Sequence, residues 1–160
     1  MPRLRGALTS LQALKFNRAF NIMYEIIPNL FLANYVDASK NCPPRAFVVN
    51  CTKNFPMINE YGTRISVDDD MSDDAIFGML AALPSVTKSI EQILTAKGVV
   101  VVHCRSGQQR SACVVCAYLM KFHGYSLNDA IEFVRSRKKD ALQPRVNFMQ
   151  TLLLFKQRYI

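Results

Sequence analysis

Short apolar runs alternate along the chain with stretches that have helical spacing. The runs over residues 46–51, 64–67 and 98–102 predict short buried strands, and GVVVV at 98–102 is typical of a central parallel strand because it is continuous and β-branched. Residues 26–32 predict one more strand, which the turn pair Pro28–Asn29 interrupts. The chain therefore supplies several strands for one sheet.

Helical segments follow these runs. Residues 75–96 have helical spacing, and Pro84 inside them predicts either a kink or the start of a second helix. An apolar helix is expected over 112–122 and is closed by Gly124, a residue suited to a left-handed cap. Two more helices are expected, the last with Pro144 in its first turn. Strands that alternate with helices predict an α/β fold, with a central, mostly parallel sheet flanked by helices.

The beginning of the chain has a pattern of its own. Leucines from Leu4 to Leu14 recur at three- and four-residue spacing, which predicts an amphipathic helix over residues 1–24. This segment carries four basic groups and no acid, so a mitochondrial transit peptide is an alternative interpretation. We favour a helix that packs on the domain formed by residues 25–160, or on a partner subunit.

The composition excludes two classes of protein. Half of the 160 residues are hydrophobic and a fifth are charged, which excludes a mainly disordered chain. No apolar run reaches the ~18–20 residues that a membrane-spanning helix needs. Twenty basic against twelve acidic residues give a net charge of +8, which favours anionic partners without choosing among them. We expect no stable nucleic-acid or membrane partner.

The five cysteines lack the spacing of a disulfide framework or a zinc site. Their number is odd and no signal peptide is expected before them, so we expect free thiols in a reducing, cytoplasmic compartment. Cys113 and Cys116 form a C-x-x-C within apolar sequence, which predicts two core cysteines. Because the chain holds only two histidines, we expect neither a metal nor another cofactor.

The most informative segment is HCRSGQQRS, residues 103–111, which lies between the central strand and an apolar helix. Ligands of open α/β sheets bind at the carboxyl ends of strands, and the N-terminus of a helix favours an anion. Backbone amides around Gly107 are suited to form a concave nest for phosphate oxygens, and the planar guanidinium of Arg110 matches two of those oxygens. We therefore expect a phosphate site in this loop.

Cys104 lies at the base of the expected phosphate site. A cysteine at a helix N-terminus beside cations has its pKa lowered to roughly 3.5–7.5, so we expect a thiolate at neutral pH that attacks phosphorus and forms a phosphocysteine. The Ser111 hydroxyl is suited to donate a hydrogen bond to the sulfur when it leaves. His103 is expected to fix the loop through its ring nitrogens rather than to transfer protons.

A carboxylic acid is needed to protonate the leaving alcohol, and it can later activate the hydrolytic water. Asp68, Asp69 and Asp70 follow a predicted strand, so we expect them on a loop that borders the same sheet edge. Crowded carboxylates repel one another, which helps one of them hold a proton. The residues alone leave open which carboxylate is the acid, and the scheme requires no metal.

The motif HCRSGQQRS resembles the HC-x5-R-[ST] motif of the cysteine-dependent protein tyrosine phosphatases. More narrowly, the chain looks like the small dual-specificity phosphatases without a docking domain. The segments IIPNLFLANYVDA, FVVNCT, YGTRISVDDD and SACVVCAYLM, and the closing helices, also resemble that family. The resemblance implies a protein tyrosine phosphatase-like fold, no cofactor, and removal of phosphate from phosphotyrosine and phosphoserine/threonine in proteins through a phosphocysteine.

The resemblance also implies roles for single residues. Cys104 is the nucleophile, Arg110 clamps the phosphate and Ser111 assists the sulfur. The amides that line the cradle belong to Arg105, Ser106, Gly107, Gln108 and Gln109.

The resemblance extends to the acid. In relatives that read I-P-V-x-D the last residue is the general acid, and I-S-V-D-D here places that role on Asp69, with Asp68 as the alternative. Asn147 matches an asparagine of the closing helix region and is expected to have a supporting role.

One departure from the family pattern concerns the substrate, and one feature of viral relatives concerns assembly. Gln108 and Gln109 stand where cellular members commonly have an apolar residue and a serine, and Gln109 resembles members encoded by large DNA viruses. Some viral relatives dimerise through a short N-terminal helix, so residues 1–24 are a candidate homodimer element. A virus-encoded protein is expected in the host cytoplasm or the virion.

Two alternative functions stay open: the same chemistry on RNA 5′-triphosphate ends or phosphoinositides, and a non-catalytic phosphopeptide-binding module.

Overall fold

The computed structural model describes residues 23–160, which form five strands and five helices. The strands are β1 (Met23–Ile27), β2 (Leu30–Asn34), β3 (Phe47–Asn50), β4 (Thr63–Arg64) and β5 (Val100–Cys104). The helices are α2 (Tyr35–Asn41), α3 (Asp73–Thr95), α4 (Arg110–His123), α5 (Leu127–Arg137) and α6 (Met149–Tyr159). None of the helices in this part of the chain is long and apolar enough to cross a bilayer.

The strands form one sheet in the order β1-β2-β5-β3-β4. Only β1 runs antiparallel to its neighbour; the other three pairs are parallel. The predicted fold class, a central and mostly parallel sheet flanked by helices, is confirmed. The prediction that 98–102 is central is also confirmed, since β5 lies between β2 and β3 and all five of its residues are buried.

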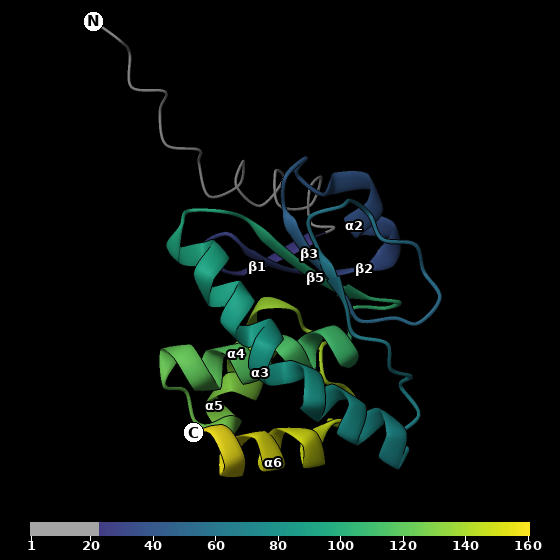
Figure 1. Cartoon of the computed structure of the whole chain (residues 1–160). Coiled ribbons are helices and arrows are strands. Elements are labelled where there is room, and N and C mark those ends of the chain that lie inside the picture. The colour runs from purple at the N-terminus through teal and green to yellow at the C-terminus, as the bar shows by residue number, and fades with distance from the viewer. Residues whose placement is uncertain (1–22) are drawn as a thin grey trace, which may run out of the picture.

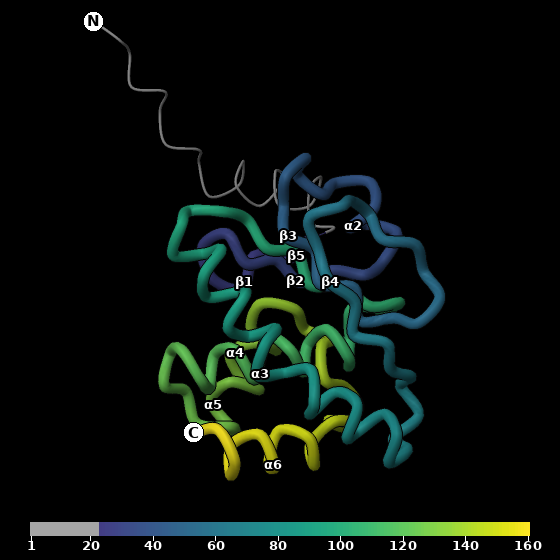
Figure 2. The backbone as a smooth tube through the Cα atoms, in the orientation of Figure 1, coloured from purple at the N-terminus to yellow at the C-terminus, as the bar shows by residue number. Residues whose placement is uncertain are grey.

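The helices cover the two faces of the sheet unequally. Helices α3 to α6 lie on one face and α2 lies on the other (Figure 1). Val100 and Val102 belong to the large core beneath α3 to α6, whereas Val101 belongs to a small cluster with Ala33 and Ala38 on the opposite face. Burying such a side chain contributes about 1.5–3 kcal/mol, so this alternation holds β5 between the layers. In Figure 2, α6 forms the layer farthest from the sheet.

Helix α4 occupies the middle of the large core because its sequence is apolar on every side. Ten consecutive residues, from Ser111 to Met120, are buried, as expected of a helix that is hydrophobic all round. Gly124 ends α4 in the left-handed conformation, with φ 69°, as its sequence position predicts. The helix is therefore fixed along its length, and its N-terminus lies directly after the loop of residues 105–109.

Four details differ from the sequence-based expectations. Residues 1–22 of the predicted N-terminal helix lie outside the described residues, and Met23–Tyr24 at its end belong to β1. Strand β4 has two residues, fewer than the predicted 64–67. Helix α2 was not predicted; Asn34 caps it by accepting a hydrogen bond from the Asp37 amide at 2.7 Å. Helix α3 continues through Pro84, so the alternative of a second helix starting there is wrong.

The prediction that Pro144 opens the last helix is also wrong. Pro144 lies in the loop between α5 and α6, and α6 begins at Met149. The carbonyl groups on either side, those of Gln143 and Arg145, accept hydrogen bonds from the side chain of Gln109 at 3.1 and 2.8 Å. These tertiary contacts replace helical hydrogen bonds, and sequence spacing alone does not reveal them.

Candidate active site

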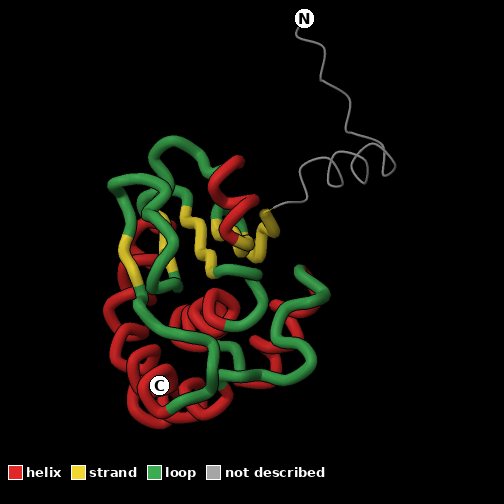
Figure 3. The backbone as a smooth tube through the Cα atoms, turned by 90° about the vertical axis from the view of Figure 1, so that its right-hand side faces the viewer, coloured by secondary structure: helices red, strands yellow, loops and turns green. Residues whose placement is uncertain are grey.

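The carboxyl ends of the parallel strands place the site residues together. Asn34 at the end of β2 pairs with Cys104 at the end of β5, and Asn50 of β3 pairs with His103. The loops that follow these strands therefore lie at one edge of the sheet, which is where open α/β folds bind ligands. Figure 3 shows loops gathered on this side of the molecule.

Cys104 lies at the base of the loop that joins β5 to α4. It is 2% exposed, and its sulfur accepts a hydrogen bond from the Gly107 amide at 3.2 Å. The Ser111 hydroxyl oxygen lies 3.1 Å from the same sulfur. An N–H donor and a hydroxyl directed at one sulfur stabilise negative charge on it, so the surroundings suit a nucleophile or a leaving thiolate.

Gly107 gives the loop its curvature. Its φ is +72°, and a Cβ atom at this position would lie 2.8 Å from the carbonyl carbon and oxygen of Ala33. Only glycine combines this backbone conformation with so close an approach to β2. The Tyr35 amide donates to the carbonyl oxygen of Arg105 at 3.2 Å, so the loop is fixed against the end of β2.

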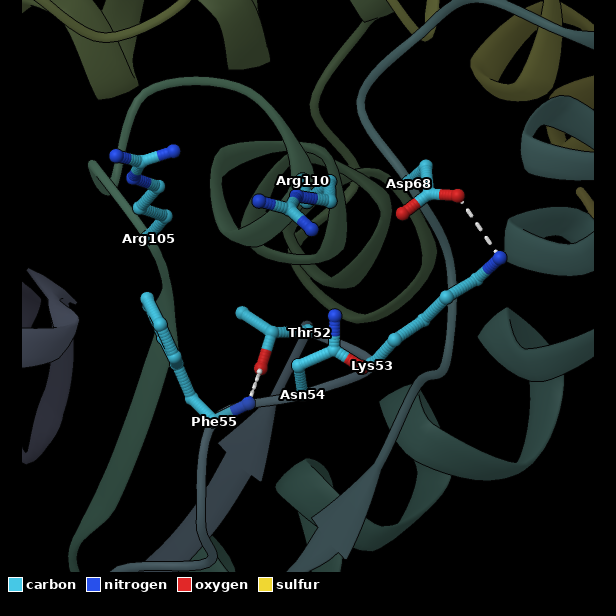
Figure 4. Close-up of a pocket in the computed structure, with 7 residues that line it drawn as sticks. All are labelled: Thr52, Lys53, Asn54, Phe55, Asp68, Arg105 and Arg110. Carbon is cyan, nitrogen blue, oxygen red and sulfur yellow. Dashed lines mark hydrogen bonds and ion pairs between the residues drawn. The ribbon is translucent and has the colours of Figure 1, made fainter.

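Arg110, the first residue of α4, lies in the middle of a cleft beside this loop (Figure 4). Its Nη1 donates to the carbonyl oxygen of Val67 at 3.0 Å. Its Nε atom is buried and has no hydrogen-bond partner among residues 23–160. Because a buried donor without a partner costs about 1–3 kcal/mol, the guanidinium is arranged for a bound acceptor such as a phosphate oxygen.

The cleft has a volume of about 200 Å³ and opens beside Arg110 (Figure 4). Its lining residues are Thr52, Lys53, Asn54, Phe55, Asp68, Arg105 and Arg110. Sequence reasoning missed the four residues from Thr52 to Phe55. The signal was available, because only Cys51 separates them from β3, whose carboxyl end lies beside that of β5. The Phe55 ring stacks on Tyr35 with 4.4 Å between ring centroids, so one wall of the cleft is aromatic.

The three candidate acids have different partners. Asp68 lines the cleft and pairs with Lys53 at 2.8 Å; this hydrogen bond and its charge raise the pKa of Lys53. Asp69 accepts a hydrogen bond from the side-chain amide of Asn147 at 3.0 Å. The Asp70 carboxylate accepts a hydrogen bond from the Ser72 amide at 3.0 Å, and the hydrogen bonds from Ser72 lower the pKa of Asp70, which opposes a proton-donating role.

Asn147 therefore lies beside one of the predicted acids, although 78 positions separate it from Asp69 in the sequence. His103 is buried, and its Nδ1 lies 3.3 Å from the carbonyl oxygen of Cys104. Its Nε2 has no hydrogen-bond partner in the part of the chain that the structure describes, so only Nδ1 lies near a backbone acceptor, and the role of His103 in fixing the loop stays a prediction. Burial lowers the pKa of His103, which favours the neutral ring.

Of the remaining predicted cradle residues, Arg105 lines the cleft, whereas Ser106, Gln108 and Gln109 are not among its lining residues. Arg105 and Ser106 are exposed, Gln108 is half-buried and Gln109 is buried. All five cysteines carry free thiols. Cys113 and Cys116 lie in the large core, as predicted, and burial raises the pKa of Cys116 to about 12. No group of three or more potential metal ligands among His, Cys, Asp and Glu occurs within residues 23–160.

Comparison with known proteins agrees with this geometry. The family model "Dual specificity phosphatase, catalytic domain" matches residues 30–158. The chain is 38% identical over 147 residues to the dual specificity protein phosphatase Mpk3 of Drosophila melanogaster, an alignment that covers 84% of this chain and 34% of Mpk3. It is 33% identical over 138 residues to "Putative tyrosine phosphatase 123R" of Invertebrate iridescent virus 6, which covers 83% of this chain and 91% of the viral protein.

A solved structure is similar as well. The crystal structure of human DUSP28 superposes with a TM-score of 0.71 at 26% identity, covering 85% of this chain and 93% of that chain. The chain spans only about a third of the length of Mpk3. With the family model covering most of the chain and the strand–loop–helix site in place, the chain belongs to the dual specificity phosphatase family.

Proposed function

We propose that the protein hydrolyses phosphotyrosine and phosphoserine/threonine in proteins through a phosphocysteine at Cys104. The observation that carries the proposal is the position of its sulfur, 3.2 Å from the Gly107 amide and 3.1 Å from the Ser111 hydroxyl oxygen, at the base of a loop flanked by Arg110. The N-terminus of α4 adds a positive dipole end at the same place. A dianionic phosphate is therefore drawn to the atom that attacks it.

The first step forms a sulfur–phosphorus bond and breaks the phosphorus–oxygen bond of the ester. The Cys104 sulfur supplies the electron pair, and the departing alcohol takes a proton from Asp69. The Arg110 guanidinium and the loop amides stabilise the charge on the equatorial oxygens of the transferring phosphoryl group. The product is a phosphocysteine and a free hydroxyl on the substrate.

The second step returns the enzyme to its starting state. Asp69 takes a proton from water, whose oxygen forms a bond to phosphorus while the sulfur–phosphorus bond breaks. The thiolate that leaves is stabilised by the Ser111 hydroxyl and the Gly107 amide. Inorganic phosphate is released, and the proton on Asp69 is available for the next leaving alcohol.

Asp69 suits the acid role better than Asp68 because of its partner. The neutral amide of Asn147 donates to Asp69, whereas the ammonium of Lys53 pairs with Asp68. The ion pair directs the Asp68 carboxylate toward Lys53, whereas the Asn147 amide orients Asp69 without a charged partner. Asp68 remains the alternative because it lines the cleft.

The test is hydrolysis of an aryl phosphate by the wild-type protein and by Cys104→Ser. We expect turnover by the wild type and none above background by the variant; equal rates would refute the proposal. The same pair is then compared on phosphopeptides, RNA with a 5′-triphosphate and phosphoinositide head groups. We expect phosphopeptides to be the preferred substrates, and binding of phosphopeptide without turnover would instead support a binding module.

A further inference from the structure

Gln109 precedes Arg110, and its side chain contacts the loop between α5 and α6. It is 5% exposed and stands at the N-cap of α4 without making a capping hydrogen bond. Its Nε2 donates to the carbonyl oxygens of Gln143 and Arg145 at 3.1 and 2.8 Å, and its Oε1 accepts from the Asn147 amide at 3.0 Å. Both polar atoms of this carboxamide are therefore used by one backbone segment.

The segment that Gln109 holds has no helix or strand of its own. It lies between the end of α5 and Met149, and Leu142 within it has a φ of 58°. The Leu142 amide donates to the Gln108 carbonyl oxygen at 2.8 Å, which fixes the first half of the segment to the cradle. The Gln109 side chain fixes the second half, residues 143–147.

Asn147 continues this path toward the proposed general acid. Its backbone amide donates to Gln109, and its side-chain Nδ2 donates to Asp69 at 3.0 Å. A chain of hydrogen bonds thus runs from Gln109, at the start of α4, through Asn147 to Asp69 in the acid loop. The bond to Asp69 depends on the position of the Asn147 backbone. The Gln109 side chain is not among the groups that line the cleft and makes no hydrogen bond to Asp69, so it reaches the acid through Asn147, whereas its neighbour Arg110 reaches the acid loop through the Val67 carbonyl.

We infer that Gln109 is a positioning residue, whose carboxamide holds Asn147 where it orients Asp69 for proton transfer. The inference rests on the proposed function. It predicts a particular signature, because a misplaced acid harms only substrates whose leaving group needs a proton. A phosphothreonine peptide has a poor alkoxide leaving group, whereas an aryl phosphate with an acidic phenol leaves without that help.

The experiment compares Gln109→Ala, Asn147→Ala and the double variant on these two substrates. We expect Gln109→Ala to lower kcat on the phosphothreonine peptide roughly 10-fold, a part of the 10²–10⁴-fold that acid–base catalysis supplies, and to change the aryl phosphate rate little. The double variant should be no slower than Asn147→Ala, since both changes act on one path. Inhibition by inorganic phosphate should stay unchanged, because the cradle is intact.

Two further variants separate positioning from folding. Gln109→Glu keeps the shape and one acceptor but removes both N–H donors, so it should show the same signature as Gln109→Ala. The side chain in Gln109→Asn is one methylene shorter. This variant replaces Gln109→Ala in the experiment if the alanine variant does not fold. Gln150→Ala, on the exposed side of α6, removes a surface carboxamide as the matched control and should behave as wild type.

Three results would overturn the inference. If Gln109→Ala lowered kcat equally on the phosphothreonine peptide and the aryl phosphate, or weakened inhibition by phosphate, Gln109 would act on the cradle instead of the acid. If the fold-decrease in kcat of the double variant equalled the product of the two single decreases, Gln109 and Asn147 would act independently. A wild type without Cys104-dependent turnover would refute the proposed function itself, and a difference between the two substrates would then not arise.

Discussion

The Nη1 atom of Arg110 donates a hydrogen bond to the carbonyl oxygen of Val67 at 3.0 Å, across 43 positions of sequence. Val67 directly precedes the three aspartates, so the guanidinium that faces the cleft also holds the acid loop. One side chain thereby joins the two halves of the proposed reaction, the phosphate cradle and the proton donor.

Replacing Arg110 by lysine should therefore impair more than phosphate affinity. A lysine ammonium is a point charge that cannot match two phosphate oxygens and hold the Val67 carbonyl at once. We expect kcat to fall by about 10²–10³-fold, as when a transition-state donor is removed, with weaker inhibition by vanadate. Steady-state kinetics check this, with Arg158→Lys at an exposed position of α6 as control. Wild-type rates in Arg110→Lys would contradict the assigned role.

The two acid candidates can be separated by leaving group. Asp69→Ala should slow hydrolysis of alkyl phosphates by about 10²–10⁴-fold and that of activated aryl phosphates much less. Asp68→Ala should keep the ratio of the two rates near that of the wild type, because it removes only the ion pair with Lys53. If the ratio changes in Asp68→Ala and not in Asp69→Ala, the acid is Asp68.

Gly107 and Gly124 form a matched pair for testing the cradle. Both have positive φ, +72° and +69°, but a Cβ at Gly107 would collide with Ala33, whereas a Cβ at Gly124 would meet no described residue within 4 Å apart from its neighbours in the chain. Gly124→Ala should cost roughly 1–2 kcal/mol of unfolding free energy for its backbone conformation and leave activity unchanged. Gly107→Ala should lose more stability and most activity. Denaturant unfolding and kinetics measure both; similar effects would contradict the account.

Thiol chemistry should distinguish Cys104 from the other buried cysteines, Cys51, Cys113 and Cys116. Desolvation raises the pKa of the Cys51, Cys113 and Cys116 thiols, so at neutral pH they are protonated and become thiolates only as the pH rises. Since the thiolate is the nucleophile, iodoacetamide at neutral pH should modify Cys104 before these three cysteines. Peptide mapping by mass spectrometry checks this, and added inorganic phosphate should protect the site. Faster modification of a core cysteine would contradict the prediction.

Local sequence predicted the elements whose determinants are local. The β-branched run before Cys104 predicted the central strand, and Gly124 predicted the end of α4, because burial and backbone conformation act there within a few residues. The grouping of Cys104, Arg110 and Ser111 followed from the same strand–loop–helix order. These three residues lie together in the structure.

Long-range contacts explain what the sequence did not predict. Pro144 is compatible with the first turn of a helix, but the side chain of Gln109 binds the carbonyl groups beside it. Helix α3 continues through Pro84 because packing against α4 and α6 outweighs the missing hydrogen bond. The cleft wall at Phe55 depends on how β3 lies beside β5, which requires the strand order.

The most direct test of the central claim is to trap the covalent intermediate. Asp69→Ala is mixed with a radiolabelled aryl phosphate and quenched within the first turnover, because the first step then proceeds while activation of water is slowed. We predict one labelled peptide, with the phosphoryl group on Cys104, and no label in Cys104→Ser. Turnover without protein-bound phosphate, or label on any other side chain, would contradict the account.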